Sequence, residues 1–130
     1  MKNHGYIKVA AAIPSVKVAD IDFNVEHIKG LIDRAVAEGV EIITFPELCI
    51  TGYTCQDLFC NTFLLDKSDD ALLDLTRHCM NLPIVVIVGA AIRQDNRLFN
   101  SAVIIAGGTY YTINKTYLPN YNEFYEKRWF

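Results

Sequence analysis

The stretch VEIITFPELCITG, residues 40–52, joins a short apolar run to a proline and a carboxylate. Residues 41–45 are rich in β-branched and aromatic side chains, which predicts a buried strand. Pro46 ends this strand and Glu47 follows directly. The end of a strand is a common place for a reactive side chain, because the sheet fixes its position. A solvated loop carboxylate is the alternative, and this stretch alone favours it.

The residues before this stretch predict another strand and a helix. Residues 8–13 read as a strand that ends at Pro14, and Asp20 or Asp22 is placed to cap the following helix. Gly39 suits the position just after that helix. One helix face carries the apolar residues Ile28, Leu31, Ile32, Ala35 and Val36. Strand, helix and strand in close succession predict two neighbouring parallel strands.

Downstream, we expect mostly loop over residues 46–61, with one turn around residues 56–59, and a helix near residues 69–80. Three further strands follow, separated by polar or glycine-rich turns, at residues 84–92, 99–105 and 109–113. The first of these is apolar throughout, which is typical of a strand covered on both faces. The order of elements predicts an α/β domain with helices layered on a mixed sheet, antiparallel where hairpins join the strands.

Composition limits the classes of function. The 130 residues, 52% of them hydrophobic, fit one domain with its own core. A net charge of −3 gives no electrostatic argument for nucleic acid or an anionic membrane as a partner. The longest apolar runs, residues 9–13 and 84–88, are too short to span a bilayer, and we find no signal-peptide hydrophobic region. We therefore expect a cytoplasmic protein.

The chain has four cysteines, and they allow several interpretations. No pair has C-x-x-C spacing, so we expect no metal site. A disulfide framework needs an oxidising compartment, which nothing in the sequence indicates. A catalytic thiol remains conceivable. The interpretation that we favour is buried or half-buried reduced thiols at Cys49, Cys55, Cys60 and Cys79.

Glu47 and Lys115 hold equivalent positions, because each follows a predicted strand by one or two residues. If both strands belong to one sheet, the two side chains can meet over its edge. A carboxylate beside a lysine can accept a proton while the ammonium stabilises developing negative charge. The alternatives are an ordinary surface ion pair that contributes about 0–1 kcal/mol, or no pair at all. The spacing alone does not decide between them.

Three ordered blocks supply a resemblance to a known family. They are FPELCITGYTCQDLF (45–59), FNSAVII (99–105) with Gly108 after it, and NKTYLPNYNEFYEKRWF (114–130). Together they resemble the nitrilase, or carbon–nitrogen hydrolase, superfamily. More closely, they are similar to the N-terminal glutaminase domain of glutamine-dependent NAD synthetases. Because three separate blocks occur in the same order along the chain, this is a specific match and not a lone short pattern.

The resemblance implies roles for five residues. Glu47 would be the general base for a cysteine nucleophile, Lys115 would stabilise the oxyanion, and Glu126 would be the second, supporting glutamate. Tyr121 would help to bind glutamine, and Tyr53 would lie near the mouth of the ammonia route. For both tyrosines, half-buried packing is the alternative.

The resemblance also implies how much of a larger protein the chain represents. The fold would be part of an α-β-β-α sandwich, with residues 1–130 as the N-terminal portion of the hydrolase domain. The nucleophilic cysteine would follow Phe130, so we expect the 130 residues alone to be inactive. Ammonia from glutamine would serve the ATP-dependent amidation of deamido-NAD to NAD. The glutaminase half would need no cofactor, whereas ATP and magnesium would belong to the synthetase domain of the same protein.

Two other functions remain open at this point. A stand-alone amidase or carbamoylase of the same superfamily would share Glu47 and Lys115 but act on another amide. A catalytically silent interaction module would use the fold as a scaffold. For any of these, half of a sandwich leaves an apolar sheet face without cover, so we expect the chain to form a homo-oligomer.

Overall fold

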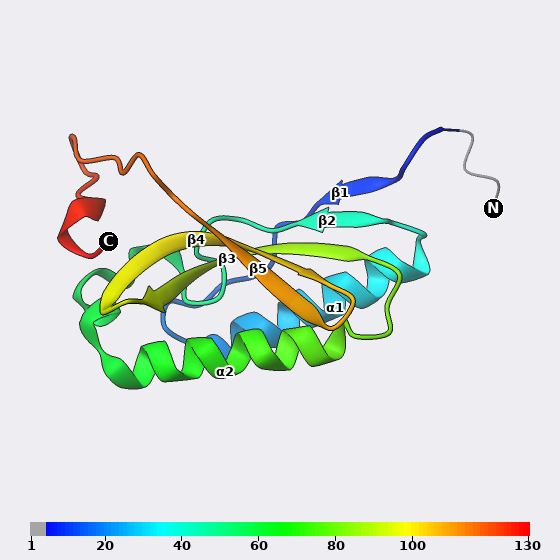
Figure 1. Cartoon of the computed structure of the whole chain (residues 1–130), viewed down its shortest axis with the longest axis horizontal. Helices are drawn as coiled ribbons and strands as arrows, with labels where there is room; N and C mark the ends of the chain where they lie inside the picture. The colour runs from blue at the N-terminus through cyan, green and yellow to red at the C-terminus, as the bar shows by residue number, and fades with distance from the viewer. Residues whose placement is uncertain (1–4) are drawn as a thin grey trace.

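A computed structural model describes residues 5–130 and contains one five-stranded sheet with two α-helices (Figure 1). The strands lie in the order β1-β2-β3-β4-β5; β1, β2 and β3 are parallel, and β4 and β5 are added as antiparallel hairpins. The mixed sheet and the parallel β1–β2 pair confirm the predicted fold class. The strands are β1 Val9–Ala11, β2 Ile42–Thr44, β3 Val85–Gln94, β4 Arg97–Ala106 and β5 Thr109–Asn114.

Helix α1 (Ile21–Ala37) begins where its capping residue predicted. The side chain of Asp20 accepts a hydrogen bond from the backbone N–H of Phe23, at 3.1 Å. Gly39 follows the helix with a φ of 74°, the left-handed conformation that glycine adopts without steric strain.

Helix α2 (Thr62–His78) begins earlier than the sequence predicted, because Asn61 rather than a later residue is its N-cap. The Asn61 side chain accepts a hydrogen bond from the N–H of Leu64, at 3.1 Å. Phe63 remains 71% exposed, so the first turn lacks the apolar periodicity on which the prediction relied.

The two helices run parallel to each other along one face of the sheet (Figure 1). Three exposed ion pairs join them, each between residues 45 positions apart: Asp22 with Lys67, Lys29 with Asp74, and Asp33 with His78. The core lies between this helix layer and the sheet. Its fully buried side chains include Ile28, Ile32, Leu72, Leu75, Val86, Val88 and Ile105.

The opposite face of the sheet has no helix over it among the described residues (Figure 1). We call it the open face. The strand register places seven apolar residues on this face, next to one another on neighbouring strands. They are Val9, Ile42, Val85, Ile87, Ile104, Tyr111 and Ile113. All seven are exposed or only partly buried. No helix within residues 5–130 is long and apolar enough to cross a membrane.

Two short 3-10 helices complete the chain. The first, η1 (Tyr53–Cys60), lies inside the region predicted as loop, and its backbone turns sharply at Gln56, where φ is 52°. The second, η2 (Glu126–Arg128), lies in the aromatic C-terminal segment. That segment continues beyond the end of β5 and turns back toward the end of the sheet where β3 meets β4 (Figure 1). On the way, Asn122 takes a φ of 50°, a conformation that asparagine tolerates better than most residues.

All four cysteines are free thiols. Cys49, Cys55 and Cys79 are buried, as expected, whereas Cys60 is exposed at the end of η1.

Candidate active site

Glu47 is carried by a loop that packs tightly on strand β3. The loop leaves β2 through Phe45, whose N–H donates to the carbonyl of Ile87 at 2.8 Å. It then crosses Gly89, where an added Cβ would lie only 2.2 Å from the backbone nitrogen of Leu48. Only glycine permits this approach. The sheet and this close contact together fix the backbone from which Glu47 projects.

The buried side chain of Asn24, on α1, is hydrogen-bonded to the same loop. Its amide nitrogen donates to the carbonyls of Ile50 and Lys17, both at 2.9 Å, and its oxygen accepts from the N–H of Lys17 at 2.7 Å. Because buried polar groups need hydrogen-bond partners, these contacts specify one position for the loop. Sequence reasoning placed the apolar face of this helix but did not identify Asn24.

Lys115 follows the last strand, β5, and the pairing of β4 with β5 extends to it. Its N–H donates to the carbonyl of Asn100 at 2.8 Å. Its ammonium Nζ lies 2.6 Å from Oε1 of Glu47, a residue 68 positions earlier. The predicted meeting of Glu47 and Lys115 is therefore confirmed, and both side chains are partly exposed.

Two buried residues join this pair. Nζ of Lys115 also lies 3.1 Å from Oε1 of Glu126, which is 2% exposed. Asn100, 3% exposed, donates its amide N–H to Glu47 at 2.6 Å and to Glu126 at 3.5 Å. We call Glu47, Asn100, Lys115 and Glu126 the carboxylate cluster. Sequence reasoning did not single out Asn100, although a polar side chain within an otherwise apolar strand was the available signal.

Tyr53 and Tyr121, the two other predicted site residues, differ in position. The hydroxyl of Tyr53 donates to Oε1 of Glu126 at 2.8 Å, so Tyr53 adjoins the carboxylate cluster. Tyr121 is 64% exposed, and two aromatic contacts connect it to Tyr53 beside the cluster. Its ring lies 5.8 Å from that of Phe124, which lies 6.4 Å from that of Tyr53.

The electrostatics of the cluster follow from its charges. Partial burial lowers the pKa of Lys115, but hydrogen bonds and charge pairing with Glu47 and Glu126 outweigh this effect and raise the pKa above its ordinary value. Lys115 is therefore a cation at neutral pH. Burial and the neighbouring Glu126 carboxylate raise the pKa of Tyr53, so its phenol stays protonated and donates a hydrogen bond to Glu126.

A cavity of about 410 Å³ opens beside the cluster, on the open face of the sheet. Glu47, Asn100 and Lys115 form its polar wall, and strand residues such as Ile87 and Ile113 form its apolar wall. A small amide fits a site of this kind, which combines apolar surface with a few convergent polar groups. Here the carboxylate of Glu47 can accept a proton, and the ammonium of Lys115 can stabilise negative charge on an oxygen.

None of the four cysteines is positioned as the nucleophile of this cavity. Cys49, two residues from Glu47, is 2% exposed, and its thiol faces the carbonyl of Gly89 at 3.7 Å. Burial raises the pKa of Cys49 to about 11, so the thiolate is scarce at neutral pH. The expectation that Cys49 is structural agrees with this geometry.

Comparisons with known proteins identify relatives that match most of the length of this chain. The carbon-nitrogen hydrolase family matches residues 8–128. A glutamine-dependent NAD(+) synthetase of Mycobacterium tuberculosis is 36% identical over 126 residues, which is 96% of this chain and 19% of that protein. One from Aquifex aeolicus is 34% identical over 114 residues, 87% of this chain and 20% of that protein. The chain thus spans about a fifth of the length of these relatives.

Solved structures agree with the sequence relatives. The crystal structure of a glutamine-dependent NAD(+) synthetase from Cytophaga hutchinsonii superposes with a TM-score of 0.89 at 30% identity, over 95% of this chain and 21% of that one. An amidase from Nesterenkonia shares the fold, with a TM-score of 0.78 at 17% identity over 88% of this chain and 44% of that one. The family match extends over nearly every described residue. The chain belongs to the carbon-nitrogen hydrolase family.

Proposed function

We propose that residues 1–130 form the N-terminal part of a glutamine-hydrolysing domain in a glutamine-dependent NAD synthetase. One observation carries the proposal: Lys115 contacts both Glu47 and Glu126 beside a cavity of suitable size. The similarity to NAD synthetases over 96% of the chain supports glutamine as the amide. The alternatives, a stand-alone amidase and a silent scaffold, have no comparable support.

In the proposed reaction, Glu47 is the general base. Its carboxylate takes the proton of a cysteine thiol as the sulfur attacks the carbonyl carbon of the glutamine side-chain amide. The tetrahedral intermediate then collapses, the carbon–nitrogen bond breaks, and Glu47 returns the proton to the leaving nitrogen, which departs as ammonia. Water, deprotonated by Glu47, hydrolyses the thioester to glutamate and the free thiol.

Lys115 and Glu126 act on charge and position. The ammonium of Lys115 stabilises the oxyanion of the tetrahedral intermediate. Glu126 holds that ammonium from the buried side, at 3.1 Å, while Glu47 holds it at 2.6 Å. Two carboxylates around one ammonium keep it charged and oriented.

The tyrosines have proposed roles at the edge of the site. Tyr53, hydrogen-bonded to Glu126, lies where ammonia would leave. Tyr121, exposed and joined to Tyr53 through Phe124, would contact the bound glutamine.

The remaining parts of the reaction belong to other residues of the proposed protein. We propose that the nucleophilic cysteine follows residue 130. A solved relative from Acinetobacter baumannii is described in complex with ADP, which supports ATP use by the synthetase half, and magnesium would accompany it. We propose that ATP and magnesium serve the synthetase domain and that the glutaminase half needs no cofactor. We also propose a cytoplasmic protein.

The test uses the full-length protein that contains this chain. Replacing Glu47 with Gln, which preserves shape but removes the base, should lower kcat for ammonia release from glutamine by about 10²–10⁴-fold. Lys115→Met should lower it by about 10²–10³-fold. NAD formation from added ammonia, which bypasses glutamine, should stay within twofold of the unmodified protein in both variants. Full glutaminase activity in Glu47→Gln, or glutamine hydrolysis by residues 1–130 alone, would refute the proposal.

A further inference from the structure

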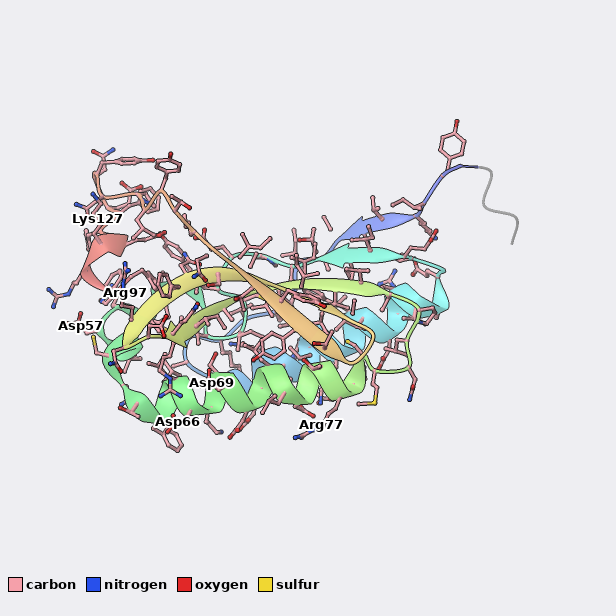
Figure 2. All side chains as sticks on the ribbon, in the orientation of Figure 1. Asp57, Asp66, Asp69, Arg77, Arg97 and Lys127 are labelled. Atoms are coloured by element: carbon pink, nitrogen blue, oxygen red, sulfur yellow. The ribbon has the colours of Figure 1, made fainter. Side chains whose placement is uncertain are left out.

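The side chain of Asp57, in the middle of η1, receives three hydrogen bonds from the C-terminal segment. Nε and Nη2 of Arg128 donate to its two oxygens at 2.7 and 3.0 Å, and the indole N–H of Trp129 donates at 3.1 Å. Figure 2 labels Asp57 at the end of the molecule where the C-terminal turn lies. The reaction proposed above gives no role to these residues.

These contacts make the second of two connections between η1 and η2. The first is the hydrogen bond from Tyr53, at the start of η1, to Glu126, at the start of η2. The second joins Asp57 to Arg128 and Trp129, at the end of η2. The start and the middle of η1 are therefore joined to the start and the end of η2, by contacts between residues more than 70 positions apart in the sequence.

The backbone of η2 transmits the second connection to Glu126. The N–H groups of Trp129 and Phe130 both donate to the carbonyl of Glu126, at 3.0 Å. These hydrogen bonds close η2 into a single turn. When Arg128 and Trp129 are held in place, the backbone of Glu126 therefore has little room to move. The side chain of Glu126 in turn contacts Lys115 at 3.1 Å, within the carboxylate cluster.

An apolar contact supports the same arrangement. Phe59, which is 1% exposed, has its ring 6.1 Å from that of Trp129 and 5.1 Å from that of Phe130. The ion pair and these rings act in different ways. Aromatic packing holds the segment against the protein, whereas the paired bonds of a carboxylate and a guanidinium specify orientation.

Exposure limits what the ion pair can do for stability. The side chains of Asp57 and Arg128 are 67% and 61% exposed, so their pairing contributes little to the free energy of unfolding. Hydrogen bonds from Arg128 and Trp129 lower the pKa of Asp57 to about 2, so the carboxylate is charged at any physiological pH. The two-point geometry of the contact orients Arg128, although its contribution to stability is small.

We propose that Asp57 is a positioning residue: by binding Arg128 and Trp129 it holds η2 so that Glu126 stays in contact with Lys115. The proposal rests on the glutaminase function proposed above, in which Lys115 must be oriented toward the reacting amide. Displacement of a catalytic group by about 1 Å can lower a rate by up to about 100-fold, so a weak contact can have a large kinetic effect.

The first test compares Asp57→Ala with Asp74→Ala in the full-length protein. Asp74 is a matched control because it is also an exposed carboxylate, 52% exposed, paired with a lysine on the helix layer. We expect Asp57→Ala to lower kcat for glutamine hydrolysis about tenfold with KM within about twofold. Asp57→Asn, which keeps one acceptor for Trp129, should recover part of the loss. Asp74→Ala should equal the unmodified protein.

Equal kcat for Asp57→Ala and Asp74→Ala would overturn the proposal, and so would a change confined to KM. If Asp57→Ala fails to fold by circular dichroism, Asp57→Asn decides the question in the same assay. NAD formation from added ammonia should be unchanged in every variant. A loss there as well would mean a general structural defect and would also overturn the proposal.

The second test does not depend on catalysis. In the unmodified protein, the hydroxyl of Tyr53 donates to Glu126 at 2.8 Å. If η2 moves in Asp57→Ala, this hydrogen bond lengthens or breaks, so the ring ¹³C chemical shift of Tyr53 at neutral pH should change, as measured by NMR of ¹³C-labelled tyrosine and assigned with Tyr53→Phe. An unchanged chemical shift refutes the positioning role. If the unmodified protein does not hydrolyse glutamine, the glutaminase proposal fails, and this chemical shift still decides whether Asp57 positions Glu126.

Discussion

The two faces of the sheet are built from the same strands and have opposite environments. On the helix-covered face, Val86 and Ile105 are completely buried. On the open face, Tyr111 and Ile113 are 66% and 60% exposed, although both are large hydrophobic side chains. Alternation along a strand normally pairs an apolar face with a polar one, and here both faces are apolar. The sequence of the strands is therefore suited to cover on both sides.

The cavity lies on the open face, beside the carboxylate cluster. The covered face supplies the rigid support, and the loop that carries Glu47 is the local cover over Gly89. Side chains on the helix-covered face therefore hold the fold, whereas side chains on the open face are available for binding or association.

The largest expected effect is a difference in stability between substitutions at two neighbouring residues of β4, one on each face of the sheet. Ile105 is completely buried on the covered face, and Ile104 is half-buried on the open face. Ile105→Ala should lower the free energy of unfolding by about 2–5 kcal/mol because it leaves a cavity in the core. Ile104→Ala should lower it by less than about 1 kcal/mol. Urea denaturation measures both, and equal losses would show that the open face is covered.

The second prediction concerns what the open face does in the isolated chain. We propose that two copies associate through it, because a contiguous exposed apolar surface favours association. Ile113→Lys should weaken the dimer by at least about tenfold, since burial of one such side chain contributes about 1.5–3 kcal/mol. Phe63→Lys is the control, because Phe63 is an exposed residue of α2 on the other side of the sheet (Figure 1), and it should leave association unchanged. A folded monomer at micromolar concentration in sedimentation experiments contradicts the proposal.

The third prediction concerns the point where the loop of Glu47 covers the open face. Gly89→Ala places a methyl group 2.2 Å from the backbone of Leu48, so the loop must shift. We expect a loss of about 1–3 kcal/mol in the free energy of unfolding. Gly30→Ala in α1 is the matched control, because its Cβ would meet nothing within 4 Å, and it should stabilise by up to about 1 kcal/mol. If both substitutions stabilise, the loop does not approach β3 closely.

The smallest effect concerns the C-terminal turn, which belongs to neither face. The pKa of Asp57 is depressed to about 2 in the folded chain, below the ordinary value of about 4. Its contribution to holding η2 is therefore present above pH 4 and is lost as the pH falls through about 2. Fluorescence of Trp129, the sole tryptophan, should report this change. Asp57→Asn should remove the transition, and its persistence would assign it to global acid unfolding.

Much of the fold follows from local sequence signals. Asp20 capped α1, apolar runs marked all five strands, and the strand–helix–strand spacing predicted parallel pairing. The start of α2 was missed because an asparagine cap and an exposed first turn carry no hydrophobic period. The meeting of Glu47 with Lys115 followed from their equivalent positions after strands.

The sequence by itself determined the elements and the family, because caps, turns and apolar periodicity act over a few neighbouring residues. Only the tertiary structure decided that Asn100 bridges two carboxylates and that Tyr53 donates to Glu126, since these contacts join residues 26 to 73 positions apart. It also decided which apolar face of the sheet the helices cover. Alternation assigns residues to two faces, but only packing in three dimensions assigns a partner to each face.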